Sequence, residues 1–221
     1  MPETTTIGRR PRVIVVGMLK GGSGKTTSAV LIAHRYAALG DDVDLLDGDQ
    51  TSQSSYDWAR QAGLAGNPLP FNVDRHPYVD DVVEEIRRRR DAGRRVVVDA
   101  GGGSAQYLEE VCSIADVLLA TLAPSGADAR RLDATLRAAE RGAARNPDGL
   151  DAYVALVRCD NRTSAPGRWE EQLLADERPL LDTKVRDLVL YSDAYGHRPD
   201  DVGEYEPLLA EVEAERAAVL A

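Results

Sequence analysis

One short segment constrains this chain more than any other: VIVVGMLKGGSGKTTSAVLIA, residues 13–33. An apolar run leads into a glycine-rich loop, and the loop leads into a sequence with helical spacing. This strand–loop–helix order is the context in which loops bind phosphate. Glycines let backbone N–H groups converge on phosphate oxygens, and the helix contributes its positive N-terminal end. The segment therefore predicts a nucleotide site within an α/β fold.

The loop departs from the usual phosphate-loop pattern, G-x-x-x-x-G-K-[ST], in two ways. Five positions before Gly24 the pattern has a glycine, and this chain has Leu19. The next residue, Lys20, adds a second lysine to the loop. The chain has only three lysines, Lys20, Lys25 and Lys184, so two of them five residues apart indicate a function.

The residues of the loop have distinct expected roles. Lys25 can reach the β- and γ-phosphates, and the Thr26 hydroxyl can ligate Mg²⁺. The expected nucleotide-binding residues are Lys20, Gly21, Gly22, Ser23, Gly24, Lys25, Thr26 and Thr27. The alternative, an ordinary glycine-rich turn, does not account for the strand, the Gly-Lys-Thr-Thr run and the helix together.

Apolar strands alternate with helical spacing along the rest of the chain. We predict strands at 12–17, 43–47, 94–100, 115–124, 151–159 and near 180–186, and helices at 24–39, 78–93, 127–145, 166–176 and 204–220. Continuous apolar strands separated by amphipathic helices predict a doubly wound α/β fold, a mostly parallel sheet with helices on both faces. We find no internal repeat or linker, so residues 12–221 are expected to form one domain after an N-terminal tail, 1–11.

Acidic residues end two of the predicted strands. Ligands of such sheets bind at the carboxyl ends of the strands, so Asp47 and Asp99 should face the same crevice as the phosphate loop. Mg²⁺ prefers oxygen ligands, and a buried carboxylate without a partner is costly. Two alternatives stay open: Asp47 and the nearby Asp49 can each cap a helix or turn, and the glycines after Asp99 can form a plain turn.

The motif KGGSGKTT, residues 20–27, resembles the deviant Walker A motif of the ParA/MinD family of dimeric ATPases. The resemblance implies a P-loop NTPase fold, ATP or ADP and Mg²⁺ as cofactors, and slow ATP hydrolysis. It also implies that Lys20 crosses a dimer interface to the partner's nucleotide, while Lys25 acts in its own site.

Two further stretches resemble parts of the same family. DGDQ, residues 47–50, resembles an Asp-x-Asp-Pro-Gln stretch. This makes Asp49 the candidate for positioning the attacking water and the Mg²⁺ shell, with Asp47 a second catalytic candidate. Gln50 and Thr51 stand where the family has Pro-Gln, and Gln50 either does the work of that glutamine or has no such role.

The stretch VVVDAGGG, residues 96–103, resembles the family's next strand and switch. The resemblance implies a metal site formed by Thr26, Asp49 and Asp99. It also implies that Gly102 offers a backbone N–H near the γ-phosphate.

Weaker similarities cover three other places. Residues 124–128 resemble a Pro-Ser-x-x-Asp stretch beside the family's dimer interface, and Ser54 to Trp58 resembles the small plasmid partition ATPases. Arg158 and Asn161 follow the strand whose end contacts adenine in the family; a polar surface is the alternative for both. The residues of the first match are Pro124, Ser125 and Asp128.

The net charge of −10 argues against a dedicated nucleic-acid binder, so DNA contact needs a local basic surface. One candidate is a stripe spaced seven, four and four residues apart on the helix predicted at 127–145. Its residues are Arg130, Arg137, Arg141 and Arg145. A second is the run Arg87–Arg90 with Arg94 and Arg95. A solvated helix face is the alternative for both.

Other features separate branches of the family. Cys112 and Cys159 do not match the cluster-bridging cysteines of the iron-protein branch and are expected to be buried small hydrophobes. The acidic tail, residues 204–221, would be repelled by anionic lipid, unlike the basic membrane helix of the MinD branch, and should pack on the sheet. Eleven residues before the first strand are too few for an N-terminal DNA-binding module. No apolar run approaches a membrane span, so we expect a soluble cytoplasmic protein without a membrane partner.

The resemblance is therefore greatest to small ParA proteins, also called ParF-like. It implies an ATP-dependent homodimer, with further assembly possible, and nonspecific DNA binding. A ParB-like centromere-binding partner would stimulate hydrolysis during DNA segregation. Two alternatives stay open: a ParA-like ATPase that positions another cargo, and a metabolic ligase with the same loop.

Overall fold

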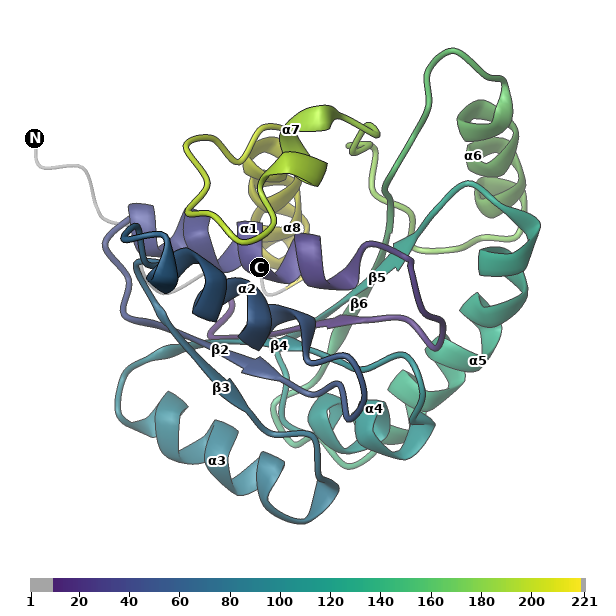
Figure 1. Cartoon of the computed structure of the whole chain (residues 1–221). Helices are drawn as coiled ribbons and strands as arrows, with labels where there is room; N and C mark the ends of the chain where they lie inside the picture. The colour runs from purple at the N-terminus through teal and green to yellow at the C-terminus, as the bar shows by residue number, and fades with distance from the viewer. Residues whose placement is uncertain (1–9, 220–221) are drawn as a thin grey trace, which may run out of the picture.

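The computed structural model describes residues 10–219, and a parallel sheet forms its centre (Figure 1). Its strand order is β3-β2-β4-β1-β5-β6, and each neighbouring pair is parallel. The strands are β1 (Val13–Gly17), β2 (Val43–Asp47), β3 (Asn72–Arg75), β4 (Arg95–Asp99), β5 (Val117–Leu122) and β6 (Asp151–Leu156). The predicted doubly wound parallel sheet is confirmed.

Helices cover both faces of this sheet (Figure 1). One face carries α1 (Lys25–Ala38), α2 (Ser54–Leu64), α7 (Val189–Asp193) and α8 (Tyr205–Val219). The other carries α3 (Val79–Asp91), α4 (Ala105–Cys112) and α5 (Gly126–Ala143). The remaining helix, α6 (Ala165–Ala175), joins α5 over the end of the sheet at β6.

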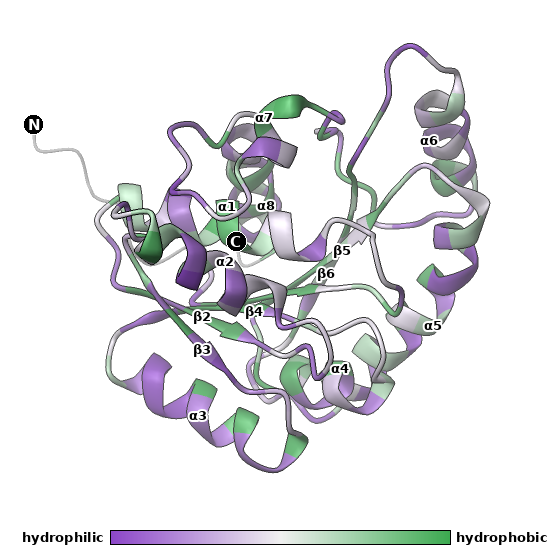
Figure 2. Ribbon diagram, viewed as in Figure 1, coloured by the Kyte–Doolittle hydropathy of each residue, from purple (hydrophilic) through white to green (hydrophobic). Residues whose placement is uncertain are grey.

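The strands lie in the middle layer because their alternating side chains enter an apolar core on each face of the sheet. Along β1, Ile14 and Val16 point into the core under α1, while Val13 and Val15 point into the core under α4. Figure 2 shows the result: hydrophobic strands lie inside, and hydrophilic residues mark the outer sides of the helices. A strand buried on both faces needs a continuous apolar run, which is the pattern that the sequence has.

Most predicted elements occur within two residues of their expected ends, but one is wrong. Instead of a strand near 180–186, the structure has two isolated bridges, Val154 to Leu180 and Cys159 to Arg186. Between them the chain turns away from the sheet, because the N–H groups of residues 182 and 183 donate to the Glu211 carboxylate in α8. Four elements are additional to the predicted set: α2, β3, α4 and α7.

The acidic C-terminal helix packs as expected. Leu208 and Val212 are buried in the core under α1, and the Arg216 guanidinium donates to the Asp116 carbonyl and the Asp151 carboxylate. Residue 220 of the predicted helix and residues 1–9 of the predicted tail lie outside the described residues. Both cysteines are buried, as predicted. Between residues 10 and 219, no helix has the length and apolar character needed to cross a membrane.

Candidate functional site

The phosphate loop joins β1 to α1 and borders a cavity of about 450 Å³. Gly24 directly precedes α1 with a φ of 84°, a left-handed conformation that glycine adopts without strain. The cavity lining from the loop and the nearby turn is Gly21, Gly22, Ser23, Gly24, Lys25, Thr26, Thr27, Asp49, Ser52 and Ser54. The predicted loop residues therefore surround one space, with the exception of Lys20.

Lys25 is the buried cation of this cavity. Its Nζ donates to the Lys20 carbonyl over 2.7 Å, the one protein acceptor that it has in the described part of the chain. Burial lowers the pKa of Lys25, although Asp99 and Asp49 act in the opposite direction. An ammonium has three donors, so a phosphate in the cavity would find donors still available.

Asp99 lies at the end of β4, in register with Asp47 on β2, so both strand ends meet at the predicted crevice. The Asp99 carboxylate accepts from the hydroxyls of Thr26, over 2.7 Å, and Ser55, over 2.6 Å. Burial raises the pKa of Asp99, and the two hydroxyls counteract it. Mg²⁺ usually takes one or two carboxylates together with phosphate and water, so this hydroxyl–carboxylate pair fits the ion.

The Asp47 carboxylate binds backbone N–H groups and does not line the cavity. It is fully buried, and its two carboxylate oxygens accept the N–H groups of Asp49, over 3.0 Å, and Tyr56, over 2.9 Å. Burial raises the pKa of Asp47 to about 6. These contacts correspond to the capping alternative, because they fix the turn after β2 and the first turn of α2.

Asp49 does border the cavity, as predicted. Partial burial raises its pKa, but the N–H groups of Ser52 and Thr51 outweigh burial, so the pKa of Asp49 is lowered. Gln50 points elsewhere: its amide donates to the Pro77 carbonyl over 2.9 Å, and it is not part of the cavity lining. Of the two alternatives for Gln50, these contacts favour the one in which it has no role in the cavity.

Gly102 packs against the phosphate loop from the far side. A Cβ at this position would lie 2.7 Å from the carbonyl carbon and oxygen of Lys20, so any larger residue would displace the loop. Gly102 is not part of the cavity lining. Its predicted N–H contact with a phosphate remains a prediction.

Lys20 lines an adjoining cavity of about 340 Å³, which shares Gly22 and Arg158 with the nucleotide cavity. Its Nζ lies 2.6 Å from Oδ2 of Asp128, a carboxylate that is 2% exposed. Ser125 caps the N-terminus of α5 and donates its hydroxyl to the same oxygen over 2.5 Å. Pro124, Ser125 and Asp128, the residues matched to a dimer interface, therefore surround the extra lysine.

The far end of the nucleotide cavity is formed by the C-terminal third of the chain. Arg158 lines it as predicted and donates to the Gly22 carbonyl over 3.0 Å. Asn161 is exposed and does not line it, so that prediction is not supported. The lining residues that sequence analysis did not identify are Ser52, Val185, Arg186, Asp187, Tyr191, Ser192, Tyr195 and Tyr205. The sequence contains one indication of this aromatic lining, since three of the eight tyrosines lie between residues 191 and 205.

Trp58 connects α2 to the C-terminal segment that lines the cavity. Its indole N–H donates to the His197 carbonyl over 2.7 Å, and its ring centroid lies 5.3 Å from that of Tyr195. Ser54, the other end of the matched stretch, begins α2 and lines the cavity. The stretch from Ser54 to Trp58 thus supports the nucleotide cavity.

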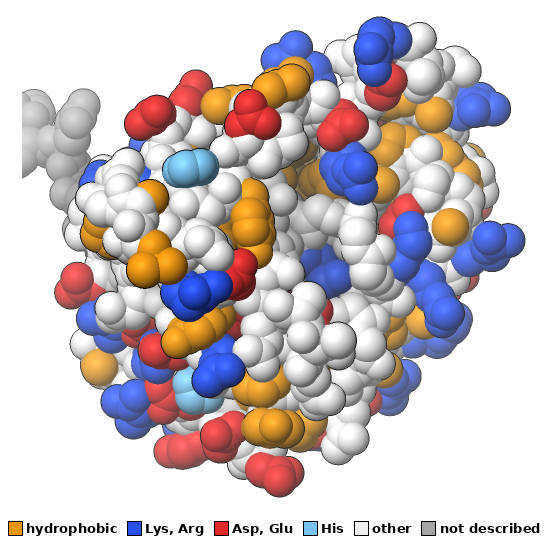
Figure 3. Space-filling model, viewed as in Figure 1, with side chains coloured by type: hydrophobic (Ala, Val, Ile, Leu, Met, Phe, Trp, Pro, Cys, Tyr) orange, Lys and Arg blue, Asp and Glu red, His pale blue; other side chains and the backbone are white. Residues whose placement is uncertain are grey.

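Basic side chains gather over α5 and α6, on the right of Figure 3. The four arginines of the predicted stripe are exposed, but they differ in their partners. Arg141 pairs with Glu109 over 2.7 Å, and Arg145 pairs with Glu109 and Glu110. Arg130 and Arg137 form no ion pair with any residue between 10 and 219.

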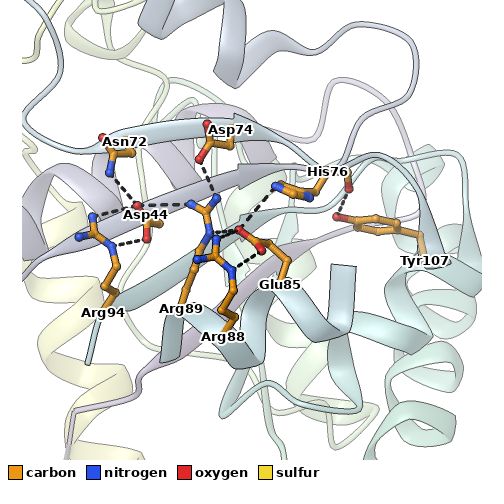
Figure 4. Close-up of polar contacts among 9 residues, drawn as sticks. All are labelled: Asp44, Asn72, Asp74, His76, Glu85, Arg88, Arg89, Arg94 and Tyr107. Carbon is orange, nitrogen blue, oxygen red and sulfur yellow. Dashed lines mark hydrogen bonds and ion pairs between the residues drawn. The ribbon is translucent and has the colours of Figure 1, made fainter. Parts of the chain in front are cut away.

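For the second predicted basic surface, the ion pairs favour the alternative of a solvated helix face. Figure 4 shows three of its arginines, Arg88, Arg89 and Arg94, in a network with acidic residues of β2, β3 and α3. Arg88 and Arg89 each lie 2.6 Å from Glu85, and Arg94 pairs with Asp44. The other partners are Glu84 for Arg87, Asp74 for Arg89, Asp91 and Asp148 for Arg90, and Asp41 for Arg95. Paired in this way, the run has no surplus of positive charge.

Comparison with known proteins gives consistent relatives. The family described as ATPase MipZ matches residues 12–137. Protein ParA of Rhizobium radiobacter is 33% identical over 182 residues, which is 81% of this chain and 64% of that protein. Maintenance of carboxysome distribution protein A of Gloeobacter kilaueensis is 31% identical over 154 residues, 69% of this chain and 66% of that protein. The chain thus spans just under two thirds of each relative's length.

A solved structure extends the similarity in fold. A plasmid partition protein of Borrelia burgdorferi B31, bound to AMPPNP, aligns with a TM-score of 0.66 at 16% identity. The alignment covers 93% of this chain and all of that one. The match to the MipZ family over more than half of the chain and the identity to protein ParA show that this chain belongs to the MipZ/ParA family of P-loop ATPases.

Proposed function

We propose that this chain is a ParA-type ATPase that dimerises on ATP and drives segregation of plasmid or chromosomal DNA. A ParB-like centromere-binding partner would stimulate its slow hydrolysis. The observation that carries the proposal is the position of Lys20, which pairs with Asp128 outside its own nucleotide cavity. A loop lysine that does not serve its own cavity is available to the nucleotide of a second copy. The relatives named for ParA and plasmid partition support this output.

The residues of the cavity divide the work of hydrolysis. Lys25 and the loop N–H groups would hold the β- and γ-phosphates, with the Gly102 N–H near the latter. Thr26, Asp99 and Asp49 would hold Mg²⁺, which when bound neutralises charge on the phosphate oxygens. Asp49 keeps its carboxylate ionised and would orient the attacking water. Asp47 supports it from beneath by fixing the turn that carries it.

The nucleoside would lie between the phosphate loop and the C-terminal wall. Arg158 borders the cavity beside the loop. Tyr191, in α7, and Tyr195, just after α7, border it as well. Aromatic rings offer faces on which a base can stack, and an arginine offers donors for its ring nitrogens and for ribose. An adenine nucleotide, ATP or ADP, fits this lining.

DNA contact is assigned first to Arg130 and Arg137, because Arg141 and Arg145 already have acidic partners. In an ATP-bound dimer, two such arginines per chain would make four phosphate contacts. Four contacts predict a log–log dependence of affinity on salt with a slope of about −3.6.

The experiment measures binding of a nonspecific duplex in ATP at several salt concentrations. Arg130→Ala/Arg137→Ala removes all four of these contacts, so it should weaken binding at least about tenfold and abolish most of the salt slope. The control Arg87→Ala/Arg88→Ala removes the same charge from arginines that are already paired, and should bind as the wild type does. Salt-insensitive binding, or full affinity in the first variant, would contradict the assignment.

A second candidate function is the positioning of another cargo by the same ATPase cycle. The observation that favours it is the 31% identity to a carboxysome distribution protein. A gene for a small basic DNA-binding protein directly beside this one, whose product accelerates hydrolysis, would favour DNA segregation. Acceleration by a component of another cargo instead would favour positioning.

A further inference from the structure

Tyr107 contacts the turn that carries Asp49, although it comes from a different part of the chain. It lies in the first turn of α4, just after the glycine loop that follows β4, and is 1% exposed. Its hydroxyl donates to the His76 carbonyl over 2.8 Å, as Figure 4 shows. Burial raises the pKa of this hydroxyl, so it remains a donor across the accessible pH range.

The ring of Tyr107 is in contact with Gly48, the residue between Asp47 and Asp49. A Cβ at Gly48 would lie 2.5 Å from ring atoms Cε1 and Cζ, and its three nearest atoms would all belong to Tyr107. The backbone at Gly48 is not left-handed, so a larger residue is disfavoured there by contact with the tyrosine and not by backbone strain. The two residues therefore fit each other.

The end of β3 completes a set of contacts around this turn. The His76 N–H donates to the Asp47 carbonyl over 2.8 Å, while the same residue's carbonyl accepts from Tyr107. The Gln50 amide donates to the Pro77 carbonyl over 2.9 Å. Tyr107 thus holds the turn directly through Gly48 and indirectly through residues 76–77.

The same turn also touches the loop that leads into α4. A Cβ at Gly101 would lie 2.8 Å from the Gly48 carbonyl oxygen and 2.9 Å from Cα of Asp49. The next residue, Gly102, is equally close to the Lys20 backbone. The loop between β4 and α4 therefore lies in close backbone contact with both the phosphate loop and the Asp49 turn.

We propose that Tyr107 is a positioning residue for hydrolysis, which locks the Asp49 turn to the loop after β4 without touching the nucleotide. Tyr107 is not part of the nucleotide cavity lining, so its effect must pass through Asp49. The proposal rests on the proposed ATP hydrolysis. It explains why a glycine stands between the two aspartates. It also assigns Gln50 to the contacts that hold the turn, through its hydrogen bond to the Pro77 carbonyl.

The test compares Tyr107→Phe with Tyr36→Phe, a control that also removes a buried tyrosine hydroxyl with one hydrogen bond, here to Glu213. Three quantities are measured: kcat for ATP, the Kd of a fluorescent ATP analogue, and the thermal midpoint. Tyr107→Phe should lower kcat roughly five- to tenfold, with the Kd within about twofold of wild type, because one hydrogen bond orients the turn but not the ligand. Tyr36→Phe should lower the midpoint similarly and leave kcat unchanged.

A double-mutant cycle tests the contact itself. Gly48→Ala and Tyr107→Leu should each lower kcat. The double variant should be more active than the product of the two effects predicts, since leucine lacks the atoms that exclude the methyl group. Purely multiplicative effects, an unchanged kcat in Tyr107→Phe, or a loss of nucleotide affinity in that variant would overturn the proposal. A wild-type protein that binds ATP without hydrolysing it would instead overturn the proposed function.

Discussion

Asp47 and Asp49 are two residues apart in the same turn, yet they meet different surroundings. Both oxygens of Asp47 accept backbone N–H groups inside the protein, whereas Asp49 borders the nucleotide cavity. Sequence alone predicts that both lie at a strand end, because the apolar run before them is continuous. It does not predict which one faces the ligand, because that depends on where α2 begins and which N–H groups it presents.

The same limit explains which site residues could be predicted. Lys25 and Thr26 belong to a contiguous motif whose geometry is local, so their place follows from spacing. Tyr191 and Tyr195 reach the cavity only because the segment after β6 folds back over α1, and no local pattern specifies that return. Asn161, which the family resemblance suggested as an adenine neighbour, lies in an exposed turn instead.

Asp49→Ala should uncouple ATP binding from hydrolysis. Removing the carboxylate takes away the group that would orient water but leaves Lys25 and Thr26 in place, so ATP should still bind and should hold the dimer. Phosphate release should fall at least about a hundredfold, while light scattering in ATP reports a persistent dimer. Asp148→Ala, an exposed aspartate that does not line the nucleotide cavity, serves as the control. A variant that hydrolyses ATP as the wild type does would exclude this role for Asp49.

The β3–α3 edge is an element pair held largely by charge. β3 reads NVDR, four residues with no apolar alternation, which explains why it was not predicted. It is specified by its partners: Arg89 of α3 is buried between Asp44, Asp74 and Glu85 (Figure 4). By contrast, α1 follows a clear apolar stripe, and its residues Ala29, Ile32, Ala33 and Tyr36 are all fully buried. Elements that bury apolar side chains are predictable from spacing, whereas those held by ion pairs depend on neighbours.

Glu85→Gln should destabilise this edge in a pH-dependent way. Arg88, followed by Arg89, lowers the pKa of Glu85 to about 2. A lowered pKa stabilises the fold above the ordinary carboxyl value and loses that effect as pH falls toward the lowered one. The substitution should therefore lower the free energy of unfolding by about 2 kcal/mol at pH 7, and by less than half of that at about pH 3. Urea unfolding at both values measures this. Glu84→Gln, exposed and paired with Arg87, should cost far less; an equal cost for Glu85→Gln at both pH values would refute the linkage.

At the scale of the whole molecule, the chain has one candidate nucleotide cavity and an extra loop lysine, Lys20, that pairs with Asp128 outside its lining. The fold class follows from alternating apolar strands and amphipathic helices, because parallel strands need helical crossovers. The strand order, with β1 between β4 and β5, does not follow from those elements alone. That order brings the ends of β1, β2 and β4 together, and with them Lys25, Asp47 and Asp99.

The central claim is that Lys20 serves the nucleotide of a second copy. In the single chain its ammonium is held by Asp128, 2.6 Å away, beside α5 and outside the cavity that Lys25 occupies. Releasing that pair and reaching a partner's phosphates would make ATP binding and dimerisation one event. Lys20→Ala should then keep ATP affinity, since Lys25 and the loop N–H groups are intact, but should lose the dimer.

The most direct measurement is molar mass by light scattering in ATP and in ADP, for the wild type, Lys20→Ala and the control Lys184→Ala. Lys184 is the third lysine, paired with Glu170 at the surface, so the control removes the same charge. The wild type and Lys184→Ala should shift in ATP from the 23.9 kDa chain to twice that mass and stay single in ADP. Lys20→Ala should bind ATP and stay single in both nucleotides. A Lys20→Ala protein that doubles its mass in ATP as the wild type does would contradict the account.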